Sequence, residues 1–229
     1  MKKIIIGLLS AFFITSCCVY HPQAIDIPLI KQKHDLRIDG GVSIIPSANA
    51  TVSYGLTSKM ALQVFGAIGS DERYYFQLAP GVYKAFRNHT VAELYTGLGY
   101  GHGNAYRDAN PGNMYGNYQL FFVQGNFGKT ESKFLNMDLG FGFKLGYFHS
   151  DLTDQNYYSF YSENGPFSSY NEKSFLIEPL AFARSGGEKL KFNIKIGYCN
   201  IYKITNTDKY IPTYPLNIGL GLNYYIKSK

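Results

Sequence analysis

The sequence contains no tryptophan, only three cysteines and few charged residues, which make up 17% of its 229 positions. Typical soluble domains carry about 25% charged residues. Two of the cysteines are adjacent, Cys17 and Cys18, so we expect no intramolecular disulfide framework. The main apolar run, Ile4 to Ile14, is shorter than the roughly 20 residues that a membrane-spanning helix needs.

Motifs of the common enzyme classes are also missing. The chain shows no phosphate-binding glycine loop, nucleophile elbow or metal-ligand spacing. The glycines at 97, 99 and 101 lie within a predicted strand and open no helix, so they do not form a nucleotide fingerprint. The basic residues that give the net charge of +6 are scattered along the chain, which disfavours a nucleic-acid partner. We therefore expect no catalytic residue, no cofactor and no metal.

Aromatic residues and glycine are abundant, with 21 Tyr, 17 Phe and 24 Gly. In the stretch from Phe134 to His149, every second residue is large and apolar, whereas the residues between them are polar or glycine. This period of two indicates a long strand. One face suits hydrocarbon and the other suits a crowded polar interior, as in the wall of a membrane barrel. The apolar face comprises Leu135, Met137, Leu139, Phe141, Phe143, Leu145 and Tyr147.

Repeats of this pattern predict an all-β fold, a closed antiparallel up-and-down transmembrane β-barrel over residues 35–229. Ten strands are expected, and eight remain if the weak first or eighth strand is misread. Connections are short after the second, fourth, sixth and eighth strands and long after the fifth, seventh and ninth, which predicts that both termini lie at the periplasmic rim. The expected strands are 35–45, 47–56, 60–69, 73–86, 90–101, 115–127, 134–149, 174–184, 189–200 and 214–226.

The amino terminus reads as an export signal followed by an anchor. Lys2 and Lys3 precede the apolar run, which ends in the sequence Ile14-Thr15-Ser16-Cys17. This resembles the lipobox of bacterial lipoproteins, which implies cleavage before Cys17 and lipidation of its thiol with fatty acyl chains such as palmitate. Residues 1–16 would then be the signal peptide and residues 17–34 a lipidated periplasmic tether. Cys18 is the rival site, and a conventional secretory signal is the alternative.

The last strand resembles the carboxy-terminal assembly signal of outer-membrane barrels, with Asn217, Gly219, Leu222 and Tyr224 at the patterned positions. As a whole, the chain resembles small outer-membrane β-barrel lipoproteins of the Bacteroidetes type, a family without an established activity. The resemblance implies an outer-membrane location. It also implies three partners: outer-membrane lipid, the barrel-assembly machinery and the lipoprotein-export machinery.

The inward faces would carry charged residues into a narrow lumen. Charges that are buried in this way persist only when they are paired, so we expect a structural network that plugs the lumen. A proton or ion path is the alternative. The predicted network comprises Glu93, Asp138, Lys144, Lys191 and Lys195, with Arg37 and Asp39 on the same inward faces.

The long break at residues 150–173 is the best candidate for a binding surface. Tyr157, Tyr158 and Tyr161 lie in a segment rich in Tyr, Ser and Asn, residue types that suit adaptable contacts with an extracellular protein or a glycan. An unstructured loop is the alternative. His149 and Asp151 invite comparison with omptin-like proteases, which act at the barrel rim, but the chain shows no defining motif of that class.

Two functional readings follow. The first is a lipid-anchored outer-membrane barrel with a structural or surface-interaction role. The second is a lipoprotein whose soluble barrel holds an apolar ligand in the periplasm, with apolar faces turned inward. If the first is right, Leu139→Arg should impair membrane assembly more than Gly140→Ala, because an arginine on the lipid face is costly.

Overall fold

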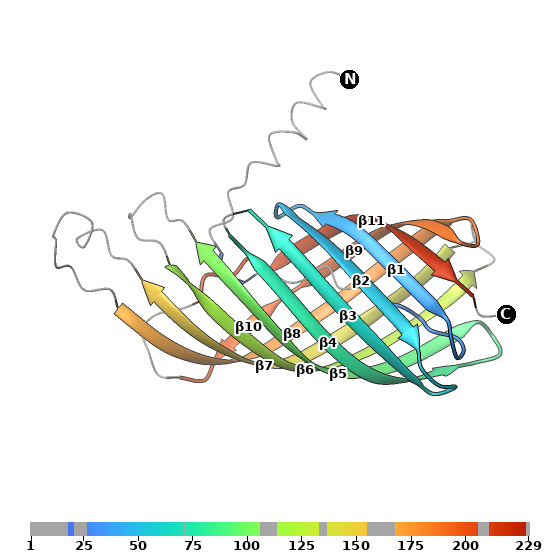
Figure 1. Ribbon diagram of the computed structural model, residues 1–229, viewed down its shortest axis with the longest axis horizontal. Helices are drawn as coiled ribbons and strands as arrows, with labels where there is room; N and C mark the ends of the chain where they lie inside the picture. Colours follow the sequence, from blue (N-terminus) through green and yellow to red (C-terminus); the bar gives the residue numbers. More distant parts are fainter. Residues whose placement is uncertain are drawn as a thin grey trace, which may run out of the picture.

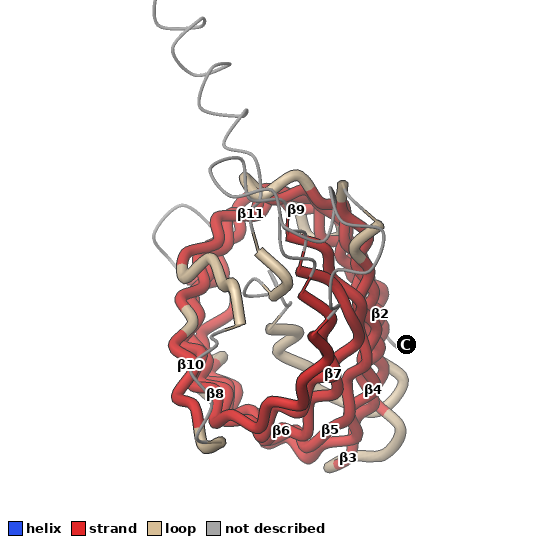
Figure 2. The backbone as a smooth tube through the Cα atoms, turned by 90° about the vertical axis from the view of Figure 1, so that its left-hand side faces the viewer, coloured by secondary structure: helices blue, strands red, loops and turns tan. Residues whose placement is uncertain are grey.

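The computed structural model describes residues 18–20, 27–70, 72–105, 114–132, 137–154, 168–205 and 211–227. Its strands form a closed antiparallel barrel whose wall runs obliquely around a central axis (Figures 1 and 2). The strands are β1 (Leu36–Ser43), β2 (Ser47–Gly55), β3 (Met60–Gly69), β4 (Tyr74–Ala85), β5 (Thr90–Ala105), β6 (Met114–Ser132), β7 (Met137–Asp154), β8 (Ser168–Gly186), β9 (Leu190–Tyr198), β10 (Asn200–Lys203) and β11 (Leu216–Ile226).

From β1 to β9 each strand pairs with the next one in the chain, β9 also pairs with β11, and the barrel closes where β1 pairs with β11. The strands β9 and β10 both pair with β8 in one continuous register. They therefore act as a single strand of the wall, and the barrel has ten strands. The two pieces are separated at Cys199, beside the point where Tyr198 would pair with Pro179. Proline has no backbone N–H to donate, so the ladder lapses there. The prediction of a closed, ten-stranded, up-and-down antiparallel barrel is confirmed.

The two faces of the wall differ as the period of two predicts. The apolar side chains of β7, from Met137 to Tyr147, point outward, whereas Asp138 and Lys144 are buried inside. The other strands repeat this arrangement, including the regular alternation of β9. No helix that could cross a membrane is found among the described residues.

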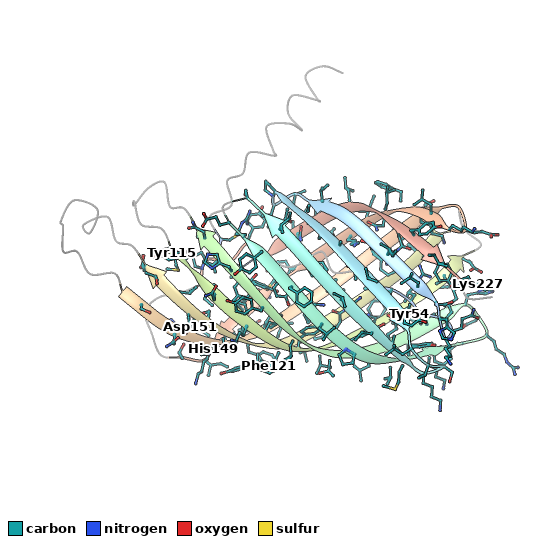
Figure 3. The ribbon with its side chains drawn as sticks, in the orientation of Figure 1. Tyr54, Tyr115, Phe121, His149, Asp151 and Lys227 are labelled. Atoms are coloured by element: carbon teal, nitrogen blue, oxygen red, sulfur yellow. The ribbon has the colours of Figure 1, made fainter. Side chains whose placement is uncertain are left out.

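The barrel has two unlike rims. The short-turn rim carries the connections 56–59, 86–89, 133–136 and 187–189, together with the start of β1 and the end of β11. The long-connection rim carries 106–113, 155–167 and 204–215, and also the two short turns 44–46 and 70–73. In Figure 3, Tyr115 and Asp151 mark the long-connection end, and Tyr54 and Lys227 mark the short-turn end.

The amino-terminal segment lies inside the barrel, where sequence analysis predicts a tether outside it. Residues 18–20 and Ile27, Leu29 and Ile30 are each at most 2% exposed. We call the described residues 18–20 and 27–34 together the lumen segment. Its apolar side chains would be unfavourable in water, and the barrel interior removes them from it.

The inner wall is correspondingly less polar than predicted. On one side of the lumen, Tyr75, Tyr95, Tyr118 and other inward-facing side chains form an apolar cluster that includes Val19, Tyr20 and Ile30. The ring of Tyr20 packs edge-on against Tyr118 and Phe148 at centroid distances of 5.5 and 5.1 Å. Large rings on several strands thus fill the space that a purely polar interior would leave to water.

A buried ionic network that holds the lumen segment

The lumen segment is held at its first end by a buried carboxylate. The hydroxyl of Tyr20 donates a hydrogen bond of 3.1 Å to Oε1 of Glu178 on β8. Oε2 of the same carboxylate lies 3.3 Å from Nζ of Lys144 on β7, and all three side chains are buried. Tyr20 is therefore a hydrogen-bond donor to the ion pair.

Two further contacts fix the second half of the segment through its backbone. The amide of Ile30 donates to Oε1 of Glu93 on β5 at 2.8 Å. The guanidinium of Arg184 on β8 donates to the carbonyl of Ile27 at 2.6 Å. Glu93 also accepts a 3.0 Å hydrogen bond from Asn126 on β6. Because Glu93 and Arg184 are both buried, losing either backbone contact would leave a charge poorly compensated.

A second ionic cluster, near the short-turn rim, joins strands that are distant in the chain. Asp138 on β7 lies 2.7 Å from Nζ of Lys191 on β9 and 3.8 Å from Arg37 on β1. Arg37 also donates to Asn223 at 3.2 Å and lies 4.2 Å from the ring centroid of Tyr225. The cluster spans the lumen and borders a polar cavity of about 650 Å³ that also contains Lys31 and Lys189.

A third cluster surrounds Asp39 on β1. Both Lys195 and Asn193 of β9 donate to its carboxylate, and Asn223 of β11 lies 3.5 Å from it. All four side chains are buried. Because β11 separates β1 from β9 in the wall, these contacts reach across an intervening strand and tie together the three strands at which the barrel closes.

The five predicted network residues all lie on the inner face and are buried. They do not form one group: Lys144, Glu93 and Lys195 belong to different clusters, and only Asp138 and Lys191 contact each other. Sequence analysis missed Glu178 and Arg184, because the inward face of β8 also carries Leu176, Leu180 and Phe182. Strict alternation from Ser174 to Arg184 was the signal that could have identified both.

The other predicted sites give a mixed picture. Cys17, Tyr157, Tyr158 and Tyr161 lie outside the described residues. His149 Nε2 is 3.8 Å from Asp151 Oδ1, but both side chains point away from the lumen (Figure 3). Within the described part of the chain, no group of His, Cys, Asp and Glu side chains could hold a metal ion.

The side chains of the interior and the lumen segment together obstruct the lumen. The carboxylates of Asp39, Asp138 and Glu178 each contact a lysine, and the aromatic cluster packs against the lumen segment near Glu178. Comparison with family models, curated proteins and solved structures finds no match to this chain.

Proposed function

We propose that the protein is an integral outer-membrane barrel, anchored by lipid on Cys17, whose own amino-terminal segment closes its lumen. Its role is structural or one of surface interaction, and it performs no catalysis. The observation that carries the proposal is the outer face, where large apolar side chains are exposed on every strand of the wall. A soluble protein rarely exposes an apolar patch larger than a few hundred Å².

Charges on this face occur only at the strand ends, as far as the outward positions are described. Lys84 and Lys129 lie toward the short-turn rim, and Asp151 and Lys173 toward the other. The band between them carries no charge at the described positions and is mainly apolar, with Thr96 and Asn200 as its polar side chains, as contact with hydrocarbon requires. Closure of the barrel also leaves no open sheet edge, which lipid would not tolerate.

Aromatic rings occur toward both edges of the apolar band. Tyr74, Tyr100 and Tyr202 lie toward the long-connection rim, and Phe86 and Tyr224 toward the short-turn rim, and all five are exposed. Such rings are enriched where a membrane meets water. They support a membrane whose two surfaces coincide with these levels of the barrel.

The soluble-barrel alternative needs the opposite arrangement of faces. A ligand-binding barrel would line its lumen with free apolar surface and turn its charges to water. Here the charged Asp39, Asp138 and Lys144 are inside, and the apolar cluster of the lumen is already packed against the lumen segment. The arrangement therefore favours the membrane reading.

Extraction of membranes tests the proposal. The Cys17→Ala variant removes the lipid anchor and leaves the barrel unchanged. We expect it to remain in washed outer membranes after treatment with carbonate or high salt, because the wall itself is embedded. Release of the variant into the soluble fraction would show that only the lipid held the protein to the membrane.

A further inference from the structure

The two ends of the lumen segment lie at opposite rims of the barrel. At the first end, the amide of Val19 donates to the carbonyl of Pro212 at 2.8 Å, in the connection before β11. Arg73, in the turn between β3 and β4, lies 3.6 Å from the sulfur of Cys18. Both partners belong to the long-connection rim.

At the second end, the amide of His34 donates to the carbonyl of Gly55 at 2.7 Å, where β2 ends at the short-turn rim. Lys31 reaches Glu131, near the end of β6 on the same rim, at 2.6 Å. An extended chain advances at most about 3.3–3.6 Å per residue, so the residues from Cys18 to His34 suffice to cross a hydrocarbon core of about 30 Å. The described parts of the segment therefore reach both rims, and the number of residues between them is sufficient to join them.

The contact with the wall is close at the first end. A Cβ added at Gly103, on the inner face of β5, would lie 2.1 Å from the carbonyl oxygen of Val19. Only glycine leaves room for the backbone of the segment there. At Gly125, on the outer face of β6, the same addition meets nothing within 4 Å.

The strands of the wall are shortest on the side of the barrel where Cys18 lies. The strands β1, β2 and β3 have 8, 9 and 10 residues, whereas β6, β7 and β8 have 18 or 19, and in Figure 1 the longer strands extend well past the shorter ones. A crevice at the β3–β4 turn is lined by Val19 and Tyr75 from inside and by Ile68 and Tyr74 from the outer face.

We infer that the amino terminus is threaded through the barrel and leaves it at the long-connection rim, over the β3–β4 turn, on the opposite side of the membrane from the carboxyl terminus. The peptide bond places the Cα of Cys17 about 3.8 Å from that of Cys18. A lipid on Cys17 would therefore anchor the protein in the leaflet at the long-connection rim. This inference rests on the proposed membrane function and revises the sequence-based prediction that both termini lie at the periplasmic rim.

A two-tag protease experiment tests the threading. The chain from residue 17 onward, with Cys17→Ser, retains every described residue and receives a different cleavable tag at each end. After the protein is reconstituted, protease is added outside the sealed vesicles. Threading predicts that each molecule loses one tag, whichever way it is inserted. Termini on one side predict that each molecule loses both tags or neither, which would overturn the inference. Detergent should expose both tags in every molecule.

Two additions keep the outcomes distinct. Vesicle flotation is measured on the same sample: protein that fails to float contradicts the proposed membrane function and this inference with it, whereas floating protein cut at both ends or neither contradicts the threading alone. The Gly103→Ala variant should release the segment, so that molecules with both tags on one side appear, whereas Gly125→Ala should retain the wild-type pattern. Identical patterns in both variants would contradict the assigned path past Gly103.

Discussion

The hydroxyl of Tyr20 hydrogen bonds to Glu178 across 158 positions of the chain, at 3.1 Å and in a fully buried setting. The contact joins the lumen segment to the ion pair between Glu178 and Lys144, whose atoms are 3.3 Å apart. The hydroxyl of Tyr20 thus links the lumen segment directly to a buried ion pair of the barrel wall.

Replacing Tyr20 with Phe should lower the free energy of unfolding by about 1.5–3 kcal/mol, the usual contribution of a hydrogen bond to a charged group. The measurement is urea unfolding of the barrel in detergent or bilayers. Tyr198→Phe is the matched control, since Tyr198 lies on the outer face at 44% exposure, and its effect should stay within about 0.5 kcal/mol. Equal effects of the two changes would contradict the anchor at Tyr20.

The ion pair on β7 and β8 should show strong coupling. Lys144→Met leaves Glu178 without its lysine, which should destabilise the barrel by about 3–5 kcal/mol. The double variant Lys144→Met/Glu178→Met should be more stable than Lys144→Met alone, since neither charge of this buried pair remains. The exposed pair Lys31–Glu131, with side chains 21% and 50% accessible, is the control, and its removal should cost at most about 1 kcal/mol. A double variant less stable than the single one would refute the pairing.

An arginine on the outer wall should be tolerated only near a rim. Leu145 is central in β7 and faces outward, and Asp151 faces the same way near the end of the strand. Leu145→Arg should reduce the free energy of folding into bilayers by about 2–4 kcal/mol, and Asp151→Arg by about 0–1 kcal/mol. Similar losses at both depths would mean that hydrocarbon does not surround the middle of the wall.

Much of the wall could be predicted because a period of two depends only on local sequence. The inner and outer faces of β7, β9 and β11 follow from the strict alternation of apolar with polar or small residues. The ten strands of the wall follow from the repetition of this pattern. The inward row of β8 broke the expected polarity, since Leu180 and Phe182 are apolar yet buried inside. Leu180 and Phe182 can face inward because they pack against Ile27 and Leu29 of the lumen segment.

The lumen segment itself could not be predicted from periodicity, because it is not a strand and its partners are distant in sequence. Its only local signal is the group of apolar residues Ile27, Leu29 and Ile30, which suits a tether in water poorly. The structure also changes one comparison: a Cβ at Gly140 would lie 2.6 Å from the ring of Phe182. Leu139 also pairs with the outward Lys129 near the short-turn rim, so Leu145→Arg is the better test of the lipid face, with Gly125→Ala as its neutral control.

The absence of tryptophan from the chain allows the most direct measurement of the central claim, that the barrel is embedded in lipid with its apolar face outward. Phe121 and Phe122 are consecutive in β6, yet Phe121 is 53% exposed on the outer face and Phe122 is 3% exposed inside. In vesicles of lipid brominated on its acyl chains, Phe121→Trp should lose most of its fluorescence and Phe122→Trp should lose little. Quenching of Phe122→Trp alone, or of neither variant, would contradict the account.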